Sequence, residues 1–296
     1  MGNSKLRNAL CSCGSQKKFK KCCMLKFKGP ELSEIKRSIQ YIEGMVKANR
    51  LAKKTLEHTA KWIKPGVSTK KLEQVAHDFM LENNARPATL NYHGFPSSIC
   101  VSLNEVICHG IPSDRELLPS DILNIDVSCE LGGYFGDTSA SYALDEAPLE
   151  AKKLIEVTAE CLKMGINAVK PYGFIGDIGA EIVKLAHQYG YSVVEKFVGH
   201  GIGKRFHEEP QVPHFGQRNT GVQILPGMIF TIEPMINLGD KEAKILKDGW
   251  TAVTIDGKLS AQFEHTILVT PKGVRVLSAE DSQLPLIASS DLLYYS

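Results

Sequence analysis

The chain has 296 residues, of which 43% are hydrophobic and 23% charged, a composition typical of a folded globular protein. No apolar run approaches the roughly 20 residues of a membrane span, and the basic N-terminus lacks the apolar segment of a secretory signal. We therefore expect a cytoplasmic protein. The length allows one large α/β unit and a small additional module.

The net charge of +2 is unevenly distributed along the chain. Residues 1–30 hold eight Lys or Arg and no acidic residue, a net +8, whereas the remainder has 27 Lys or Arg against 33 Asp or Glu, a net −6. The basic segment is therefore expected to be a separate unit that faces an anionic partner.

Four cysteines stand in the N-terminal sequence CSCGSQKKFKKCC, at Cys11, Cys13, Cys22 and Cys23. Four thiolates suit a tetrahedral zinc site, and the Gly14-Ser15 turn lets the chain fold back. The pattern resembles the SEC-C zinc motif. We predict that residues 1–30 fold around one structural zinc ion, because so short a module cannot build a core. The alternatives are a basic tail without fixed structure and a disulfide knot.

Two amphipathic helices are predicted after this module. The first runs from about residue 33 to the residue before Pro65-Gly66, with Ile35, Ile39, Ile42 and Val46 on one face. Ser68 or Thr69 caps the second, which ends near Asn83-Asn84. The following segment, residues 91–112, has a strand from about 98 to 106 with a turn near Asn104 and leads to His109.

A β-hairpin is predicted over residues 122–128 and 134–142. If its two-residue loop is Leu131-Gly132, Asp126 lies directly opposite Asp137, with Cβ atoms roughly 4.5–5.5 Å apart. Two carboxylates that close repel each other, and a divalent cation would neutralise them. A shifted register would instead leave two solvated Asp residues on an edge hairpin.

A second pair of helices is predicted at about 147–169 and 177–189, and strands resume until about residue 276. The expected organisation is therefore the zinc module at 1–30, a large domain at 31–280 and a C-terminal tail at 281–296. The large domain divides into halves at about 31–145 and 146–280.

The two halves resemble each other, which indicates an internal repeat. The sequence LPSDILNIDV at 118–127 matches LPGMIFTIEP at 225–234, so that Asp126 corresponds to Glu233. Asp137 likewise corresponds to Glu264, and the His109-Gly-Ile segment to His200-Gly-Ile.

Packing of the two halves about a pseudo-twofold axis would gather Asp126, Asp137, His200, Glu233 and Glu264 at the centre. Four carboxylates and one imidazole suit a pair of divalent ions such as Mn²⁺, Fe²⁺, Co²⁺ or Zn²⁺. The alternative is that these are unrelated surface residues of a duplicated scaffold.

The large domain resembles the type I methionine aminopeptidases. The resemblance extends from about residue 33 to residue 279. It rests on the motifs NYHGFP, CHGIP, NIDV with GDTS, VGHGIG, IEP and FEHT. It implies an α+β fold of the pita-bread (creatinase/aminopeptidase) type with an internal pseudo-twofold repeat. It also implies a hydrolase that removes the initiator methionine from nascent proteins and peptides, preferring a small second residue.

The resemblance also implies a role for each metal ligand. Asp126 would bind one metal, His200 and Glu233 the other, and Asp137 and Glu264 would bridge the two. Glu233 would accept the proton of the attacking water.

The resemblance further assigns the remainder of the site. His109 and His207 would contact the substrate amide and the tetrahedral intermediate. The methionine pocket would be formed by Tyr92, Phe95, Cys100, Phe206 and Trp250, and Asn104, Val106 and Ser260 are candidates for a monovalent-cation site.

The expected partners are nascent polypeptide N-termini, and the basic module is a candidate for docking on the ribosome. We expect a monomer. Two alternative functions are a proline-directed peptidase of the same fold, which would have a larger N-terminal domain and additional histidines, and a metal-free binding protein that has lost its ligands.

Overall fold

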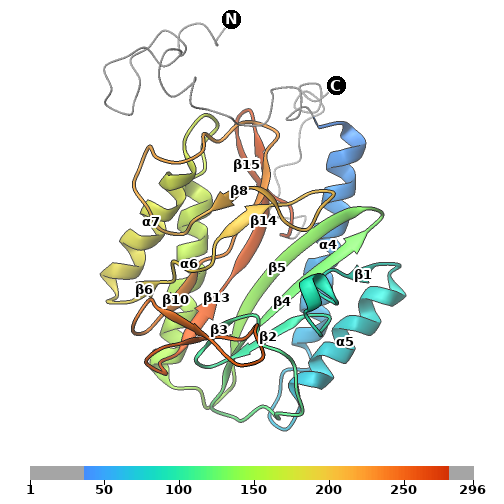
Figure 1. Cartoon of the computed structure of the whole chain (residues 1–296), viewed down its shortest axis with the longest axis vertical. Coiled ribbons are helices and arrows are strands. Elements are labelled where there is room, and N and C mark those ends of the chain that lie inside the picture. Colours follow the sequence, from blue (N-terminus) through green and yellow to red (C-terminus); the bar gives the residue numbers. More distant parts are fainter. Residues whose placement is uncertain (1–36, 280–296) are drawn as a thin grey trace, which may run out of the picture.

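A computed structural model of the chain describes residues 37–279 (Figure 1). The predicted zinc module and C-terminal tail lie outside these residues. Among the described helices, none has both the length and the apolar character needed to cross a membrane.

The first helix pair forms largely as predicted. Helix α4 (Ile39–Ala60) begins after Ser38, which is extended and whose Oγ accepts the N–H of Tyr41 at 3.2 Å. The predicted start near residue 33 lies outside the described residues. Helix α5 (Thr69–Glu82) is capped by Ser68, whose Oγ accepts the N–H of Lys71. It ends before Asn83 and Asn84, as expected.

The predicted hairpin forms, but the expected register is wrong. Strands β4 (Ile122–Leu131) and β5 (Tyr134–Ala143) are joined by Gly132-Gly133, which have φ of 60° and 83°. Such a turn favours glycine at both positions, and Leu131 stays in the strand. Asp126 therefore faces Ser139, and Asp137 faces Ser128. The two aspartates still share one face as diagonal neighbours, about 7–8 Å apart.

One large sheet contains strands from both halves of the chain. Its order is β1-β4-β5-β14-β9-β7-β8, with β2 also on β4 and β15 also on β14. The further strands are β1 (Arg86–Pro87), β2 (Cys100–Leu103), β7 (Gly199–Gly201), β8 (Glu208–Val212), β9 (Ile229–Ile232), β14 (Glu264–Thr270) and β15 (Gly273–Val276). The antiparallel pairing of β5 with β14 joins the halves, with Glu264 opposite Ser139.

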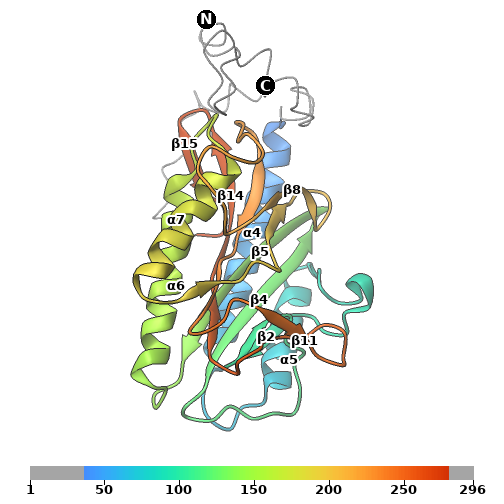
Figure 2. The ribbon, with the colours of Figure 1, turned by 60° about the vertical axis from the view of Figure 1, so that its left-hand side comes forward.

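The second helix pair, α6 (Leu149–Ala168) and α7 (Ile175–Gln188), corresponds to the first. Helices α4 and α6 run along the same face of the curved sheet, with α5 beside α4 and α7 beside α6 (Figures 1 and 2). Each pair has its own core, one containing Leu56 and Leu72 and the other Leu154 and Ile178. This duplicated arrangement matches the predicted α+β fold with two related halves.

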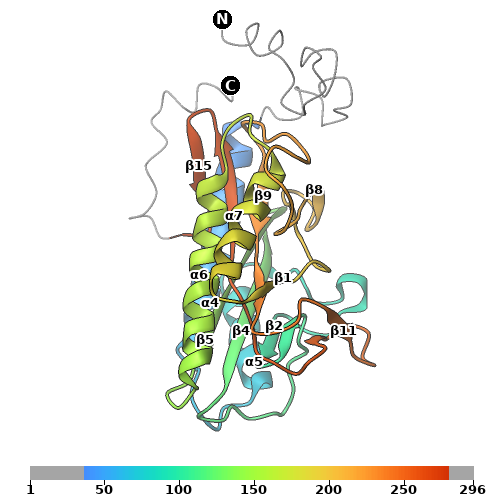
Figure 3. The same ribbon diagram turned by 90° about the vertical axis from the view of Figure 1, so that its left-hand side faces the viewer.

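Two small three-stranded sheets flank the large one, as Figure 3 shows for β11. One has the order β13-β10-β6 and the other β11-β12-β3. Their strands are β3 (Val106–Cys108), β6 (Ser192–Val193), β10 (Met235–Asn237), β11 (Ala243–Ile245), β12 (Ala252–Thr254) and β13 (Ser260–Gln262). A short 3₁₀ turn, η2 (Tyr92–Gly94), lies within the NYHGFP motif.

Close packing of α4 against β5 gives a test of the fold. A Cβ atom at Gly136 would lie 2.3 Å from the carbonyl oxygen of Ala48 in α4. Gly136→Ala should therefore lower the free energy of unfolding by about 1–3 kcal/mol, since an overpacked interface must shift. Urea denaturation of the purified protein measures this.

The matched control is Gly273→Ala, because a Cβ atom there has nothing within 4 Å. Its denaturation midpoint should stay close to that of the parent. Equal midpoints for the two variants would contradict the packing of α4 on β5.

Candidate metal centre and substrate cavity

One cavity of about 620 Å³ is lined by every residue predicted for catalysis, divalent-metal binding and substrate binding in the large domain. Its lining includes Tyr92, Phe95, Cys100, His109, Asp126, Asp137, His200, Phe206, His207, Glu233, Trp250 and Glu264. These residues come from both halves of the chain. The pairing of β5 with β14 thus brings together side chains that are far apart in sequence.

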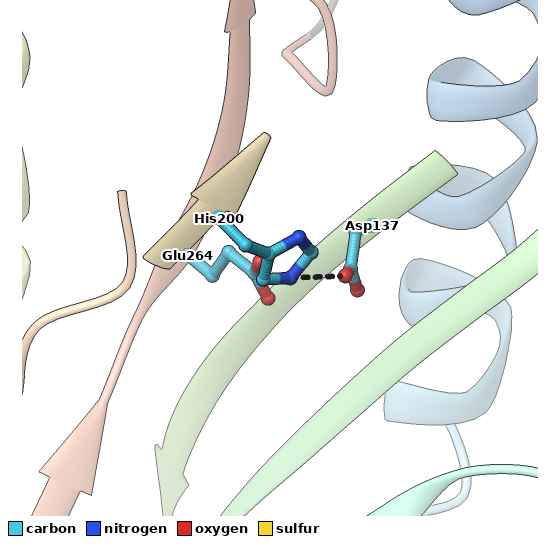
Figure 4. Close-up of side chains that lie close together, drawn as sticks. All are labelled: Asp137, His200 and Glu264. Atoms are coloured by element: carbon cyan, nitrogen blue, oxygen red, sulfur yellow. Dashed lines mark ion pairs between the residues drawn. The ribbon is translucent and has the colours of Figure 1, made fainter. Parts of the chain in front are cut away.

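The tightest polar group in the cavity is formed by Asp137 on β5, His200 on β7 and Glu264 on β14 (Figure 4). One ligand atom from each lies within 4.8 Å of those of the other two. The Nε2 atom of His200 is 3.6 Å from Asp137 Oδ2 and 3.7 Å from Glu233 Oε1. The distances between the His200 nitrogen and the two carboxylate oxygens leave room for an ion between them.

Asp126 lies beside this group on β4. Its Oδ1 atom is buried and has no hydrogen-bond partner. A buried carboxylate oxygen without a partner is unfavourable unless a cation or water accompanies it. The orphaned oxygen therefore indicates a further ligand position on the side of Asp126.

The carboxylates influence one another strongly. Burial, together with the charges of Asp137 and Glu233, raises the pKa of Asp126 well above its usual range. The same effects raise the pKa of Glu264, and burial raises the pKa of Glu233 to about 7. These shifts oppose ionisation of the group without a counter-charge.

The pKa of the His200 imidazole is raised as well, which for a base favours the charged form. Burial alone would lower the pKa of His200, but its interaction with Asp137 and the charge of Glu233 raise it. Oxygen donors with one ring nitrogen are typical ligands of Mn²⁺, Fe²⁺, Co²⁺ or Zn²⁺. The buried donor set therefore fits divalent metal binding.

The sequence did not reveal the polar residues that hold these ligands. The hydroxyl of Thr231, on β9, accepts the N–H of His200 at 2.9 Å and donates to Glu233 Oε1 at 2.8 Å. The Nε2 atom of His214, a fully buried residue, accepts the N–H of Glu233 at 3.0 Å. Burial lowers the pKa of His214 to about 3, so this imidazole is neutral.

Asp137 is likewise held by hydrogen bonds to residues of two other elements, β4 and α4. Ser128, its cross-strand partner, donates its Oγ–H to Asp137 Oδ1 at 2.8 Å. Asn49 on α4 is fully buried, and its Oδ1 accepts the N–H of Asp137 at 3.2 Å. A polar residue on the apolar face of a predicted helix was the signal that could have identified Asn49.

The two predicted substrate-contacting histidines lie at the cavity wall. His109 follows β3 with a left-handed φ of 55°, and burial lowers its pKa. The His207 ring lies 4.1 Å from that of His200, between centroids, and its Nδ1 is 2.7 Å from the Tyr92 hydroxyl. Burial and the neighbouring His200 lower the pKa of His207. Both side chains are therefore neutral at neutral pH.

The apolar part of the cavity is lined by aromatic rings. Phe95 and Trp250 meet edge to face with centroids 5.3 Å apart, and Tyr92 meets Phe206 at 4.9 Å. Cys100 lies opposite Asp126 in the β2–β4 register, so the apolar recess adjoins the carboxylates. The lining also includes Cys108, Phe197 and Met235, which sequence reasoning did not select.

The predicted monovalent-cation residues lie away from this cavity lining, where β10 and β13 approach Asn104. Asn104 has a left-handed φ of 52°, and its carbonyl oxygen accepts the N–H of Ser260 at 2.9 Å. Ser260 Oγ and Asn237 Oδ1, opposite each other in the β10–β13 register, are both buried without a hydrogen-bond partner.

Comparison with known families gives two matches. The profile of metallopeptidase family M24 matches residues 43–271, and that of the SEC-C motif matches residues 7–25. The second match contains the cysteine pattern noted in the N-terminal module. The first covers both halves of the large domain.

Individual proteins of known identity agree with these matches. The chain is 52% identical over 238 residues to methionine aminopeptidase A of Synechocystis sp., covering 80% of this chain and 94% of that protein. It is 47% identical over 253 residues to the methionine aminopeptidase of Escherichia coli, with 84% and 96% covered. The crystal structure of the Rickettsia prowazekii methionine aminopeptidase superposes with a TM-score of 0.81 at 44% identity, covering 82% of this chain and 98% of that one.

The family match, the relatives covered over nearly their whole length and the pita-bread fold all agree. Together they confirm the resemblance inferred from the motifs. The chain belongs to metallopeptidase family M24 and, within it, to the type I methionine aminopeptidases, with an N-terminal SEC-C motif.

Proposed function

We propose that the protein removes the initiator methionine from nascent polypeptides and peptides through a pair of divalent metal ions, with a preference for a small second residue. One observation carries this proposal: a buried group of carboxylates and an imidazole opens directly into an aromatic recess within a single cavity. The names of the similar proteins support the same activity.

The proposed ligands divide between two positions. Asp126 would bind one ion, His200 and Glu233 the other, and Asp137 and Glu264 would lie between them. The orphaned Asp126 Oδ1 and the close approach of Asp137, His200 and Glu264 support this division. Bound divalent ions would lower the pKa of a water molecule and polarise the scissile carbonyl group.

The protein side chains would guide the proton and the reacting carbonyl group. Glu233, whose carboxylate lies 3.7 Å from the His200 imidazole and accepts a hydrogen bond from Thr231, would accept the proton of the attacking water and return it to the leaving amine. Thr231 would keep its carboxylate aligned with His200. The neutral imidazoles of His109 and His207 would offer N–H groups to the substrate amide and to the oxyanion that develops on it.

The aromatic recess would hold the methionine side chain. A thioether packs well against aromatic rings, and Phe95, Trp250 and Phe206 offer them without a charged group. Tyr92 and His109 would limit the size of the second residue at the entrance. A monovalent cation near Asn104, Val106 and Ser260 would satisfy the buried oxygens of Ser260 and Asn237.

The remaining proposals concern organisation and location. Residues 1–30 would form a zinc module ahead of a catalytic domain at 31–280 and a tail at 281–296, in a monomeric, cytoplasmic protein. Four cysteines in the described range are free and buried, at Cys100, Cys108, Cys129 and Cys161, which suits a reducing compartment. Ribosomal RNA is the proposed anionic partner of the basic module.

Removing one proposed ligand tests the metal centre. Asp126→Asn should lower metal occupancy and reduce kcat/KM by more than about a hundredfold, since even residues that only support metal ligands account for 10–100-fold effects. Elemental analysis and a Met-Ala-peptide assay measure the two quantities. His200→Ala should behave similarly, and circular dichroism should show both variants folded.

The matched control is Asp114→Asn, because the Asp114 side chain is 91% exposed at the surface. It should retain parental metal content and activity. Full turnover by metal-stripped Asp126→Asn protein would contradict the proposed centre.

Peptide specificity tests the aromatic recess. Peptides with a free N-terminal Met followed by Ala or Gly should be cleaved, and Met-Arg peptides more slowly by over about tenfold, because a large second residue would clash at the entrance. Leu-Ala and Pro-Ala peptides should remain intact. Release of the N-terminal residue from Met-Arg, Leu-Ala or Pro-Ala peptides at a rate comparable to that from Met-Ala peptides, measured by mass spectrometry, would refute the assignment. Cleavage of the Pro-Ala peptide would favour a proline-directed peptidase.

Deleting residues 1–28 tests the role of the basic module. Hydrolysis of short peptides should change little, whereas co-sedimentation with ribosomes at low salt should fall, because phosphate binding by lysines depends on counterion release. Replacing Lys17, Lys18, Lys20 and Lys21 with Gln, while keeping the cysteines, should have the same effect. Equal sedimentation of all three proteins would exclude ribosome docking through this module.

A further inference from the structure

The strongest unexplained contact in the cavity joins two residues from different halves of the chain. The Tyr92 hydroxyl, on η2, lies 2.7 Å from Nδ1 of His207, which follows β7. The two ring centroids are 5.0 Å apart, and the Phe206 ring contacts both at 4.9 Å and 4.3 Å. The contact is therefore a short hydrogen bond between packed aromatic side chains.

The loop that carries Tyr92 is fixed by its own hydrogen bonds. The N–H of Asn91 donates to the Phe95 carbonyl at 2.8 Å, and the N–H of Tyr92 donates to the Thr89 carbonyl at 3.0 Å. Asn91 and His93, on either side of Tyr92, both have left-handed φ values, 63° and 49°. Such conformations persist only where surrounding structure holds them. The phenol is thus delivered to His207 by a preorganised loop.

The chemistry of the two groups sets the direction of this hydrogen bond. Burial raises the pKa of Tyr92, so the phenol keeps its proton. In the described part of the chain, the hydroxyl has no other hydrogen-bond partner within the protein. A phenol is a better hydrogen-bond donor than acceptor, and an unprotonated imidazole nitrogen is a stronger acceptor than a phenol oxygen, so the hydroxyl donates to His207 Nδ1. A neutral imidazole that accepts at Nδ1 carries its proton at Nε2. The two ring nitrogens point in divergent directions, which leaves Nε2 for another partner.

We propose that Tyr92 is a positioning residue whose hydroxyl holds His207 in the Nε2–H tautomer. The imidazole then presents a fixed N–H donor to the reacting peptide. Without the phenol, both tautomers of His207 become populated, and one of them has an unprotonated Nε2 that repels a developing oxyanion. This inference rests on the proposed function for its catalytic consequence, but the tautomer itself does not depend on activity.

The direct test is ¹⁵N NMR of the Zn²⁺-loaded protein labelled in its histidine rings, at neutral pH. His207, assigned by the signals missing from His207→Gln, should show a protonated Nε2 and an unprotonated, hydrogen-bonded Nδ1. In Tyr92→Phe the two nitrogen shifts should move toward each other as the tautomers mix. A protonated Nδ1 in the parent, or unchanged shifts in Tyr92→Phe, would overturn the proposal.

A double-mutant cycle tests the catalytic consequence. Tyr92→Phe keeps the ring that packs on Phe206 and should lower kcat on a Met-Ala peptide by about tenfold, with KM little changed. In the His207→Ala background, the same change should have no further effect. An equal reduction in both backgrounds would show that Tyr92 acts independently of His207 and would overturn the proposal.

The matched control is Tyr172→Phe, because Tyr172 is 47% exposed and lies outside the cavity. It should leave both the His207 nitrogen shifts and kcat unchanged. A parent protein that binds divalent metals yet cleaves no Met peptide would refute the proposed function alone, since the NMR result still decides the tautomer.

Discussion

Mutual repulsion among buried carboxylates is the constraint on which the rest of this structure depends. Asp126, Asp137, Glu233 and Glu264 line one cavity, and their pKa shifts show that burial and neighbouring charges oppose ionisation of Asp126, Glu233 and Glu264. Such a group is unfavourable by several kcal/mol per charge unless cations offset it. The fold must therefore hold these side chains rigidly when no counter-charge is present.

The duplicated architecture supplies that rigidity. Each half contributes a carboxylate to the central strand pair, Asp137 on β5 and Glu264 on β14. Thr266 donates its hydroxyl to the carbonyl of Asp137, and Thr138 donates to that of Glu264, both at 2.9 Å. Side chains of each half thus fix the backbone of the other, and neither half alone contains a complete site.

The helices complete the support from behind the sheet. Gly136 allows α4 to approach β5 closely enough for Asn49 to reach the backbone of Asp137. On the second half, Thr231 and His214 hold Glu233 from two directions. The same principle extends to the entrance, where η2 of the first half meets His207 of the second. Preorganisation of the cavity therefore depends on contacts within each half as well as between the halves.

The internal repeat and the periodicity of apolar residues allowed the site residues and the hairpin to be predicted from the sequence. The match of LPSDILNIDV with LPGMIFTIEP identified Asp126 and Glu233 as equivalent positions, and the structure brings both to one cavity. The hairpin register was wrong because the alternation of apolar residues does not say which adjacent pair forms the loop. The Gly132-Gly133 pair, which tolerates the positive φ values of the observed turn, was the sequence signal for the correct loop. Asp126 and Asp137 stayed on one face because the error shifted the pairing by two residues, which is the side-chain period of a strand.

Asn49 could have been recognised as a polar residue on an apolar helix face, but no sequence pattern assigned a partner to it, to Thr231 or to His214. Thr231 stands in the apolar run IFTI and Asn49 on a buried helix face, and both resemble isolated exceptions until tertiary contacts give them partners. His214 is likewise an ordinary loop histidine by sequence. Their roles depend on which strands and helices become neighbours, and local sequence patterns do not carry that information.

The most direct test of the central claim is anomalous diffraction from crystals of the full-length protein grown with Mn²⁺. We expect two manganese peaks inside the cavity, each flanked by the carboxylates of Asp137 and Glu264, with Asp126 at one and His200 and Glu233 at the other. Manganese bound only outside the cavity, or a cavity whose carboxylates hold no ion at saturating Mn²⁺, would contradict it.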